Sequence, residues 1–361
     1  MTPGHHRLSP ACSTALGSAG DSAPAAREPP AAEYSRRLLL LRILLERGGP
    51  VTDGAGRLPA TASAWDLLAR AQRTAPDRVR RVILDPQTGI WVADALRAMP
   101  ATASGTTGSH AAGGVPFWAE CGGLHRLAAA AAGVAGLDFR IEVPVENGTV
   151  LLPGLGRADV PHGDTAEVCG GPAGLRIGDV AVLRDPETST PGWSGLRRLR
   201  AECAGQVLDV ALDDLGRPPV GGHARRPAQL TGTEYDGWRR RAQGAWAVLV
   251  RDHPDTAAAL SAGLLSLVSL PHGERLRPHS ASFSDAFGCV VLSAPHPDDE
   301  PGAATELAVT LLHEFRHTVL NGLMRLAPLH DGTDDGLYHA PWRDDPRPLI
   351  GLLHGADAFA G

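Results

Sequence analysis

One segment near the end of the chain, residues 307–323, is apolar almost all round a helical period and yet contains two histidines and a glutamate. A helix of this composition is expected to be buried. Buried polar groups need partners, because burying them alone is costly in free energy. His313 and His317 are four residues apart, so a helix places both imidazoles on one face beside Glu314. The sequence therefore predicts a metal site on a buried helix over residues 303–326, and the alternative is a pair of hydrogen-bonded core histidines.

A functional metal on this helix needs a third ligand. The metzincin continuation is absent, since leucines stand where that pattern has its glycine and next histidine, and no gluzincin second helix follows. Pro348 can begin a further helix that carries His354. We predict His354 as the third ligand, with His339 as the main alternative and His330 as a weaker one.

The periodic patterns predict an α+β fold with a helical N-terminal part, a β-hairpin-rich middle and a buried C-terminal helix that carries the His-Glu-His motif. Residues 1–33 are mostly Ala, Ser, Gly and Pro and are expected to form a flexible arm. The other expected regions are a mainly helical region over 34–135, a β-rich region over 136–235 and a helical, metal-binding catalytic region over 236–361.

Four local patterns refine this organisation. Residues 34–47 predict an amphipathic helix that stops at Gly48-Gly49-Pro50. Residues 100–115 are of low complexity and predict a linker loop. Five consecutive alanines, residues 128–132, predict a buried packing helix. Alternating residues 139–143 and 149–152 around Asn147-Gly148 predict a β-hairpin.

Charge and cysteine content narrow the class of protein. The net charge is −6, and no block of five or more basic residues is present, so we expect no nucleic-acid partner. The 5 cysteines are scattered without a CxxC pair, which is typical of reduced thiols in a cytoplasmic protein. The chain has no signal-peptide pattern and no apolar run long enough to span a membrane, so we expect no membrane partner.

With these motifs in place, the chain resembles the HExxH-motif domain family of the biosynthesis of ribosomally synthesised and post-translationally modified peptides (RiPPs). The last 75 residues carry the most specific part of this resemblance, in residues 287–293, 313–317, 340–349 and 351–355. Weaker similarity covers most of the remaining chain, in residues 34–37, 128–132, 213–215 and Ser280–Ser282.

The resemblance implies β-hydroxylation of a side chain in a precursor peptide, with Fe(II) as the metal and 2-oxoglutarate and O₂ as co-substrates. Neutral imidazoles suit Fe(II) and Zn(II) alike, so Zn(II) is the alternative metal. Arg347 and Arg343, held between prolines and beside Trp342, are candidates to bind the distal carboxylate of 2-oxoglutarate through a guanidinium fork. A structural ion pair with Asp344 or Asp345 is the alternative for these arginines.

Glu314 has a different role in each function. In a zinc metallopeptidase, which is the first alternative, it would be the general base that activates water. In a hydroxylase we expect it to orient a ligand or to lie in the shell around the metal. The second alternative is a non-enzymatic protein that binds the precursor peptide.

Members of the family continue with further helices where this chain reaches Gly361. We therefore expect substrate-binding elements either to be absent or to come from a second copy in a homodimer.

Overall fold

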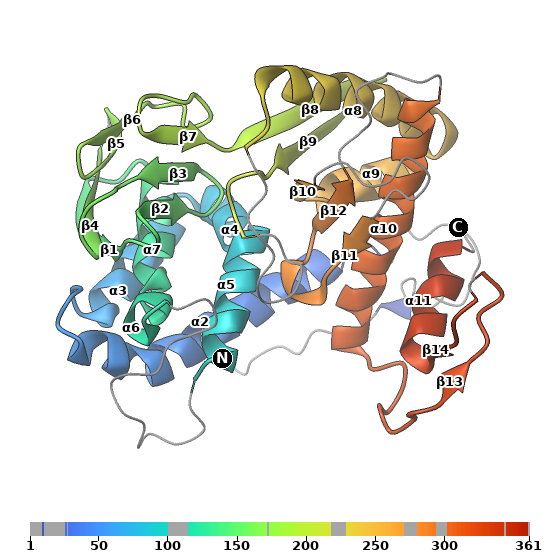
Figure 1. The fold of residues 1–361 in the computed structure, drawn as a ribbon, viewed down its shortest axis with the longest axis horizontal. Coiled ribbons are helices and arrows are strands. Elements are labelled where there is room, and N and C mark those ends of the chain that lie inside the picture. The colour runs from blue at the N-terminus through green and yellow to red at the C-terminus, as the bar shows by residue number, and fades with distance from the viewer. Residues whose placement is uncertain are drawn as a thin grey trace. The chain divides into compact units, whose positions relative to one another are not determined.

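The computed structural model describes residues 9–10, 26, 28–99, 115–171, 173–217, 229–270, 280–293, 302–342 and 344–359. Helices and antiparallel sheets occur together in these residues, so the fold is α+β as predicted (Figure 1). None of the helices in these ranges combines the length and the apolar character needed to cross a bilayer.

The chain forms two compact units, which cut across the four regions expected from the sequence. The N-terminal unit consists of Tyr34–Arg198 and Ala211–Gln229. The C-terminal unit consists of Met1–Glu33, Leu199–Val210 and Leu230–Gly361. Most of the expected arm and of the 100–115 linker lies outside the described residues.

Helix α7 (Gly123–Val134) is the centre of the N-terminal unit. Its five consecutive alanines are completely buried, and it packs against helices and strands on several sides. Small side chains allow this close approach and lose almost no side-chain entropy in a helix. It contacts α3 (Thr61–Thr74), α4 (Pro76–Leu84) and α6 (Phe117–Cys121), and the other helices here are α2 (Pro29–Gly54) and α5 (Pro86–Arg97). The predicted packing helix is therefore confirmed.

The predicted stop at Gly48-Gly49-Pro50 is wrong, because α2 continues through it to Gly54. A Cβ atom on Gly48 would lie 2.9 Å from Sγ of Cys121, so glycine allows the helix to pack closely at this point. The hydroxyl of Thr52 donates to the Gly48 carbonyl oxygen at 3.2 Å in the turn that contains the proline. Tertiary packing has outweighed the local breaking signal.

Two antiparallel sheets complete the N-terminal unit. The first has the order β1-β4-β5-β6 and the second the order β2-β3-β7. The strands are β1 (Phe139–Pro144), β2 (Thr149–Leu152), β3 (Gly156–Asp159), β4 (Thr165–Gly171), β5 (Gly174–Ile177), β6 (Val180–Val182) and β7 (Trp193–Gly195). Paired neighbours such as β4 and β5 give the hairpin-rich middle that the sequence predicts.

The particular hairpin predicted between β1 and β2 is wrong. The turn exists, since Asn147 and Gly148 have φ angles of 50° and 71°, but only an isolated bridge joins Glu146 to Thr149. β1 pairs with β4, whereas β2 pairs with β3. Pro144 ends β1 without an N–H group to donate, and β2 instead packs on α7 with Val150 and Leu152 completely buried.

The C-terminal unit is built on a five-stranded sheet of order β11-β12-β10-β9-β8. Its strands are β8 (Arg197–Cys203), β9 (Gln206–Leu212), β10 (Ser266–Leu270), β11 (Ser280–Ser282) and β12 (Cys289–Ser293). β10 and β12 are parallel, and β11 is antiparallel to β12. The remaining elements are α8 (Gly232–Asp252), α9 (Pro254–Gly263), a 3₁₀ turn η2 (Ser284–Ala286), α10 (Ala303–Leu326), β13 (Leu337–Tyr338), β14 (Arg347–Pro348) and α11 (Leu349–Phe359).

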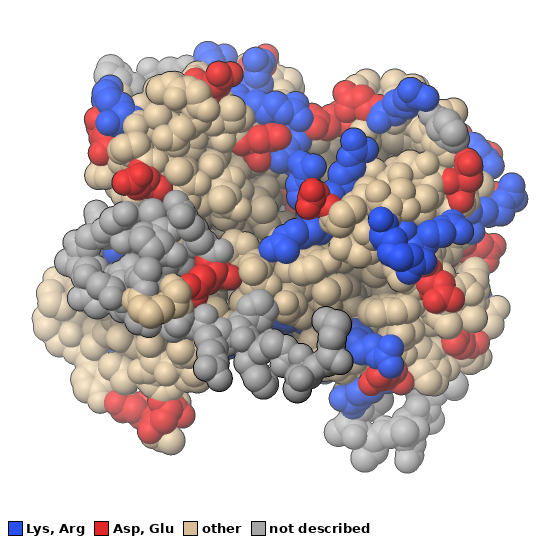
Figure 2. Space-filling model, turned by 180° about the vertical axis from the view of Figure 1, so that it is seen from behind, with Lys and Arg blue, Asp and Glu red and all other residues tan. Residues whose placement is uncertain are grey.

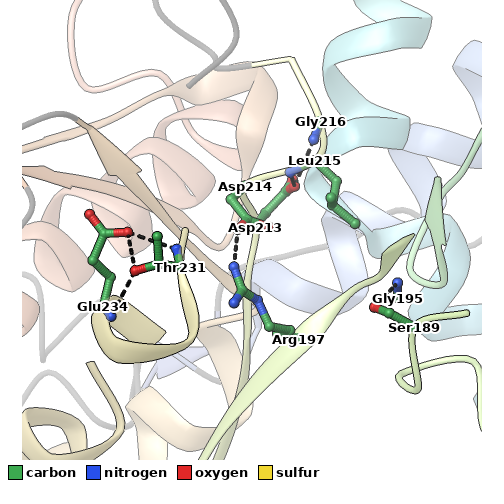
Figure 3. Close-up of polar contacts among 9 residues, drawn as sticks. All are labelled: Ser189, Gly195, Arg197, Asp213, Asp214, Leu215, Gly216, Thr231 and Glu234. Carbon is green, nitrogen blue, oxygen red and sulfur yellow. Dashed lines mark hydrogen bonds and ion pairs between the residues drawn. The ribbon is translucent and has the colours of Figure 1, made fainter. Parts of the chain in front are cut away.

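Helix α10 has the bounds that the sequence predicts and packs against α8, α11 and strands of the sheet. Helix α8 begins with a capping box, in which Thr231 accepts from the Glu234 amide and Glu234 accepts from the Thr231 amide (Figure 3). Such a cap satisfies amide groups that the helix itself leaves unpaired.

Buried carboxylates organise the junction between α4 and α5. The guanidinium of Arg37 donates to the carbonyl oxygens of Ile83 and Asp85, at 2.9 and 2.5 Å. The Asp85 carboxylate accepts from the Gln87 amide at 2.9 Å, and the Gln87 side chain donates to Asp213 at 2.8 Å. Asp213 in turn accepts from the amides of Leu215 and Gly216, toward which it points in Figure 3.

Burial, with the Asp213 charge as a second cause, raises the pKa of Asp85 to about 7.

We predict a pH-dependent stability of the N-terminal unit from this junction. Because the pKa of Asp85 is about 7 in the folded protein, against an ordinary value of 3.8 for a solvated aspartate, the folded state retains a proton that the unfolded state releases. The stabilisation is complete below pH 4 and is lost as the pH rises through 7. Asp85→Asn keeps a capping side chain without the charge, and should stabilise the protein at pH 8 by about 1–3 kcal/mol relative to the parent.

Denaturant unfolding at pH 4 and pH 8 measures this effect. Asp94→Asn, at an exposed carboxylate paired with Arg97, is the control for removal of a charge. An equal pH dependence in the parent and in Asp85→Asn would contradict the assignment.

Candidate metal centre

Two imidazoles and a carboxylate converge on one side of α10. His313 and His317 are half-buried, and Glu314 is 3% exposed. The Nε2 atoms of His313 and His317 are 3.2 Å apart, as the four-residue spacing requires. One ligand atom from each of His313, Glu314 and His317 can be chosen so that all lie within 4.8 Å of one another. This group, the His-Glu-His group, is close enough to hold a single metal ion.

Helix α11 brings a further histidine to this group. Nδ1 of His354 lies 3.2 Å from Nδ1 of His317, and the two rings meet edge to face with centroids 5.1 Å apart. Residue 354 is thus next to the His-Glu-His group, as predicted, although it presents its nitrogen to His317 and not to His313.

The two nitrogens of His317 consequently face different partners. Nε2 points to His313, and Nδ1 points to His354. A proton on Nδ1 of His317, donated to His354, leaves a free lone pair on Nε2, where it can share a metal with His313. In this arrangement His354 orients a ligand, whereas a reorientation of its ring is needed for it to become one. His354 as the third ligand therefore stays a prediction.

The protonation states suit metal binding. Burial lowers the pKa of His317 to about 4, and the neighbouring His313 and His354 act in the same direction. Burial also lowers the pKa of His354, against an opposing effect of Asp357. Metal ligands must be deprotonated, so His317, which is neutral at pH 7, need release no proton before it binds a metal.

Glu314 has an unmatched oxygen. Its Oε2 atom is buried and has no hydrogen-bond partner within the described part of the chain. A buried carboxylate oxygen without a partner is costly, and a cation in front of it would remove that cost. The residues therefore fit a bound metal.

The other predicted site residues lie further out. Trp342 packs directly on Gly355 of α11, and its ring centroid is 5.6 Å from that of Phe359, which lies 5.1 Å from His313. Arg347, in β14, forms an exposed ion pair with Asp345 at 3.4 Å, which is the structural alternative named above. Arg343 lies outside the described residues. The alternative ligands His339 and His330 do not belong to the His-Glu-His group.

The sequence analysis did not identify three residues that lie near the His-Glu-His group. Arg316, inside the motif and buried, pairs with Asp357 of α11 at 3.5 Å and so connects α11 to α10. Phe359 places its ring against His313. The signal for Asp357 was its spacing of three residues from His354, which puts both on one side of a helix.

Comparisons with known proteins leave the family open. A scan against protein-family models finds no match, and a search of curated proteins finds none. The resemblance to the HExxH-motif domain family accordingly depends on the residues quoted for it, and the function drawn from it is a proposal.

We predict that His313→Ala and His317→Ala each abolish binding of Fe(II) and leave the fold intact, because the N-terminal unit and the five-stranded sheet do not depend on a metal. Metal content after anaerobic dialysis and circular dichroism measure the two effects. His253→Ala, at an exposed histidine that ends α8, is the control. Loss of the thermal transition together with the metal would instead indicate a structural site.

An Fe(II) titration of the anaerobic protein decides the role of His354. If His354 orients His317, His354→Ala should weaken metal binding by about 10–100-fold. If it is a ligand, the loss should approach that of His317→Ala.

Proposed function

We propose that the protein is an Fe(II)- and 2-oxoglutarate-dependent hydroxylase that modifies the β-carbon of a side chain in a ribosomally synthesised precursor peptide. The observation that carries this proposal is the composition of the His-Glu-His group, two imidazoles and one carboxylate. Non-haem Fe(II) oxygenases use this donor set and leave the remaining metal positions open. We also propose a cytoplasmic location, because the described cysteines are free thiols.

Iron, when bound, supplies the redox chemistry by which 2-oxoglutarate and O₂ are converted to succinate and CO₂ while one oxygen atom enters a C–H bond. His313 and His317 would hold the metal, together with Glu314 or His354. The buried inner face of α10, with Leu311 and Phe315 almost fully enclosed, keeps water from that side of the group.

A peptide substrate fits the surroundings of the group. Phe359 and Trp342 are 63% and 37% exposed, although both are large aromatic side chains beside α11. Exposed aromatic side chains supply contact area at protein interfaces. Because the Phe359 ring lies 5.1 Å from His313, a peptide on these aromatics would pass close to the metal ligands.

The peptidase alternative is favoured by a different observation. The unpartnered Glu314 oxygen is the group that a metallopeptidase would use as a base on a metal-bound water. The two functions predict different losses of activity for the Glu314→Gln variant.

We predict that Glu314→Gln reduces turnover of 2-oxoglutarate to succinate less than His313→Ala or His317→Ala does, because hydroxylation needs no base to activate water and the amide retains an oxygen donor. A peptidase would lose several orders of magnitude. Succinate release and oxygen-atom addition to the peptide, followed by mass spectrometry on anaerobically loaded protein, test both functions. Peptide cleavage that stops in Glu314→Gln would overturn the hydroxylase.

We predict further that Arg347 or Arg343 holds the distal carboxylate of 2-oxoglutarate. The exposed pair with Asp345 contributes little, so Arg347 can exchange it for another carboxylate. A bidentate contact is worth about 1.5–3 kcal/mol, and Arg347→Lys or Arg343→Lys should raise the 2-oxoglutarate requirement by about 10–100-fold with metal content unchanged.

Arg239→Lys is the matched control, since Arg239 also forms an exposed pair, with Asp236. If Arg347→Lys and Arg343→Lys both bind 2-oxoglutarate as well as the parent does, these arginines have a structural role and do not bind the co-substrate. The buried Arg316 would then be the next candidate.

A further inference from the structure

Helix α11 has few buried side chains with which to hold its position. Among its described residues only Gly355 and Ala358 are buried, and its leucines and its isoleucine are half-buried. The stabilisation that apolar side chains give to packing is roughly proportional to the area that they remove from water. Polar contacts with α10 therefore take a larger share in holding α11 than they would in a helix with a buried apolar face.

Two polar contacts that join α11 to α10 lie one helical turn apart. Nδ1 of His354 lies 3.2 Å from Nδ1 of His317, and a carboxylate oxygen of Asp357 lies 3.5 Å from a terminal guanidinium nitrogen of Arg316. His354 and Asp357 are three residues apart, which is about 4.5 Å along the helix axis. A single contact would leave α11 free to turn about it, whereas two contacts at this separation restrict both rotation and sliding.

The charge of Arg316 depends on Asp357 for its compensation. The Arg316 side chain is 7% exposed, and its Nε atom is buried without a hydrogen-bond partner in the described residues, where Asp357 is its ion-pair partner. Figure 2 shows many arginines and carboxylates at the surface of the face that it draws, and exposed pairs of this kind contribute little. A buried charge that loses its partner is costly, so the desolvated Arg316 opposes separation of α11 from α10.

We propose that Arg316 is a positioning residue of the metal centre, which through its pair with Asp357 fixes α11 so that His354 stays against His317. Nε2 of His317, which points to His313, is on the same ring as the Nδ1 atom that faces His354, so the direction of Nε2 depends on what holds Nδ1. The proposal rests on the metal centre of the proposed function. It adds a residue that acts on this centre without touching the metal, in a hydroxylase and in a peptidase alike.

Binding of Co(II) to the full-length protein, followed by the visible absorption of the bound ion, reports on the metal centre without any turnover. Arg316→Gln and Asp357→Asn should each weaken Co(II) binding by about 10–100-fold and change the absorption spectrum, because residues that orient a ligand have effects of this size. Arg325→Gln is the matched control, since Arg325 joins α10 to another buried carboxylate, that of Glu33. Parent-like affinity and spectrum in both pair variants would overturn the proposal.

Combined variants test whether Arg316 acts through His354. If it does, Arg316→Gln should change Co(II) affinity by about twofold at most in a protein that already carries His354→Ala. The double variant Arg316→Gln, Asp357→Asn removes both charges of the pair and should lose no more affinity than the weaker single variant. A full further loss in the His354→Ala background would mean that Arg316 acts by another route, and the proposal would be wrong.

Hydrogen exchange of the metal-free protein separates positioning from a general loss of stability. Amides of α11 should exchange about tenfold faster in Arg316→Gln and in Asp357→Asn, whereas amides of α8 and α9 should exchange as in the parent. Arg325→Gln should leave α11 unchanged. Exchange that rises equally over the C-terminal unit would give the pair a purely structural role, and parent-like exchange of α11 in both variants would mean that the pair does not hold this helix. Each of these results overturns the proposal.

The alternative role of Arg316, binding of the distal carboxylate of 2-oxoglutarate, gives a distinct result. Arg316→Gln would then raise the 2-oxoglutarate requirement with Co(II) affinity and α11 exchange unchanged, which overturns the positioning role.

Failure of this proposal and failure of the proposed function are also distinguishable. Parent-like Co(II) binding by the pair variants, in a protein that hydroxylates its peptide, removes the positioning role alone. The expected Co(II) and exchange results, in a protein that forms no succinate, support the positioning role and remove the hydroxylase alone. A parent protein that binds no Co(II) overturns both.

Discussion

The four-residue spacing of His313 and His317 inside an otherwise apolar helix is the constraint on which the C-terminal unit depends. It brings the Nε2 atoms to 3.2 Å from each other, with Glu314 buried beside them. Moving imidazoles and a carboxylate out of water is costly in free energy unless they gain hydrogen bonds or a metal ion. Burial lowers the pKa of His317 to about 4, so this imidazole remains neutral at pH 7, but the Glu314 oxygen still lacks a partner in the described residues. A cation would compensate all three groups, which is why a metal explains this helix better than hydrogen bonds alone.

Helix α11 supplies the side chains that would surround such a cation. It supplies His354 next to His317 and Phe359 next to His313, and the pair between Arg316 and Asp357 connects it to α10. The pair is largely buried, and breaking it would leave a charge without compensation. The motif helix would provide the ligands of a metal, and the last helix provides a neighbouring histidine and an aromatic surface beside them.

The N-terminal unit depends on a different constraint, close packing around the alanines of α7. Because these side chains are small, α3 and the sheet can both approach α7. That packing also brings α3 alongside the first residues of β1, and residues of both line one groove. Edge strands are usually protected by charged side chains, and Arg140 and Glu142 are exposed on β1.

The sequence by itself determined the α+β class, the bounds of α10, the buried alanine helix and the convergence of His313 with His317, because each follows from a period of a few residues along the chain. Predictions from the sequence were wrong where packing between residues far apart in the chain outweighs local signals. Gly48 and Pro50 did not end α2, since close packing at Gly48 outweighs the local break, and β1 and β2 share a turn but join different sheets. Only the tertiary structure placed Asp357 and Phe359 beside the His-Glu-His group and showed which nitrogen of His317 faces the predicted His354. These contacts join residues about forty positions apart, and no local periodicity encodes the packing of one helix on another.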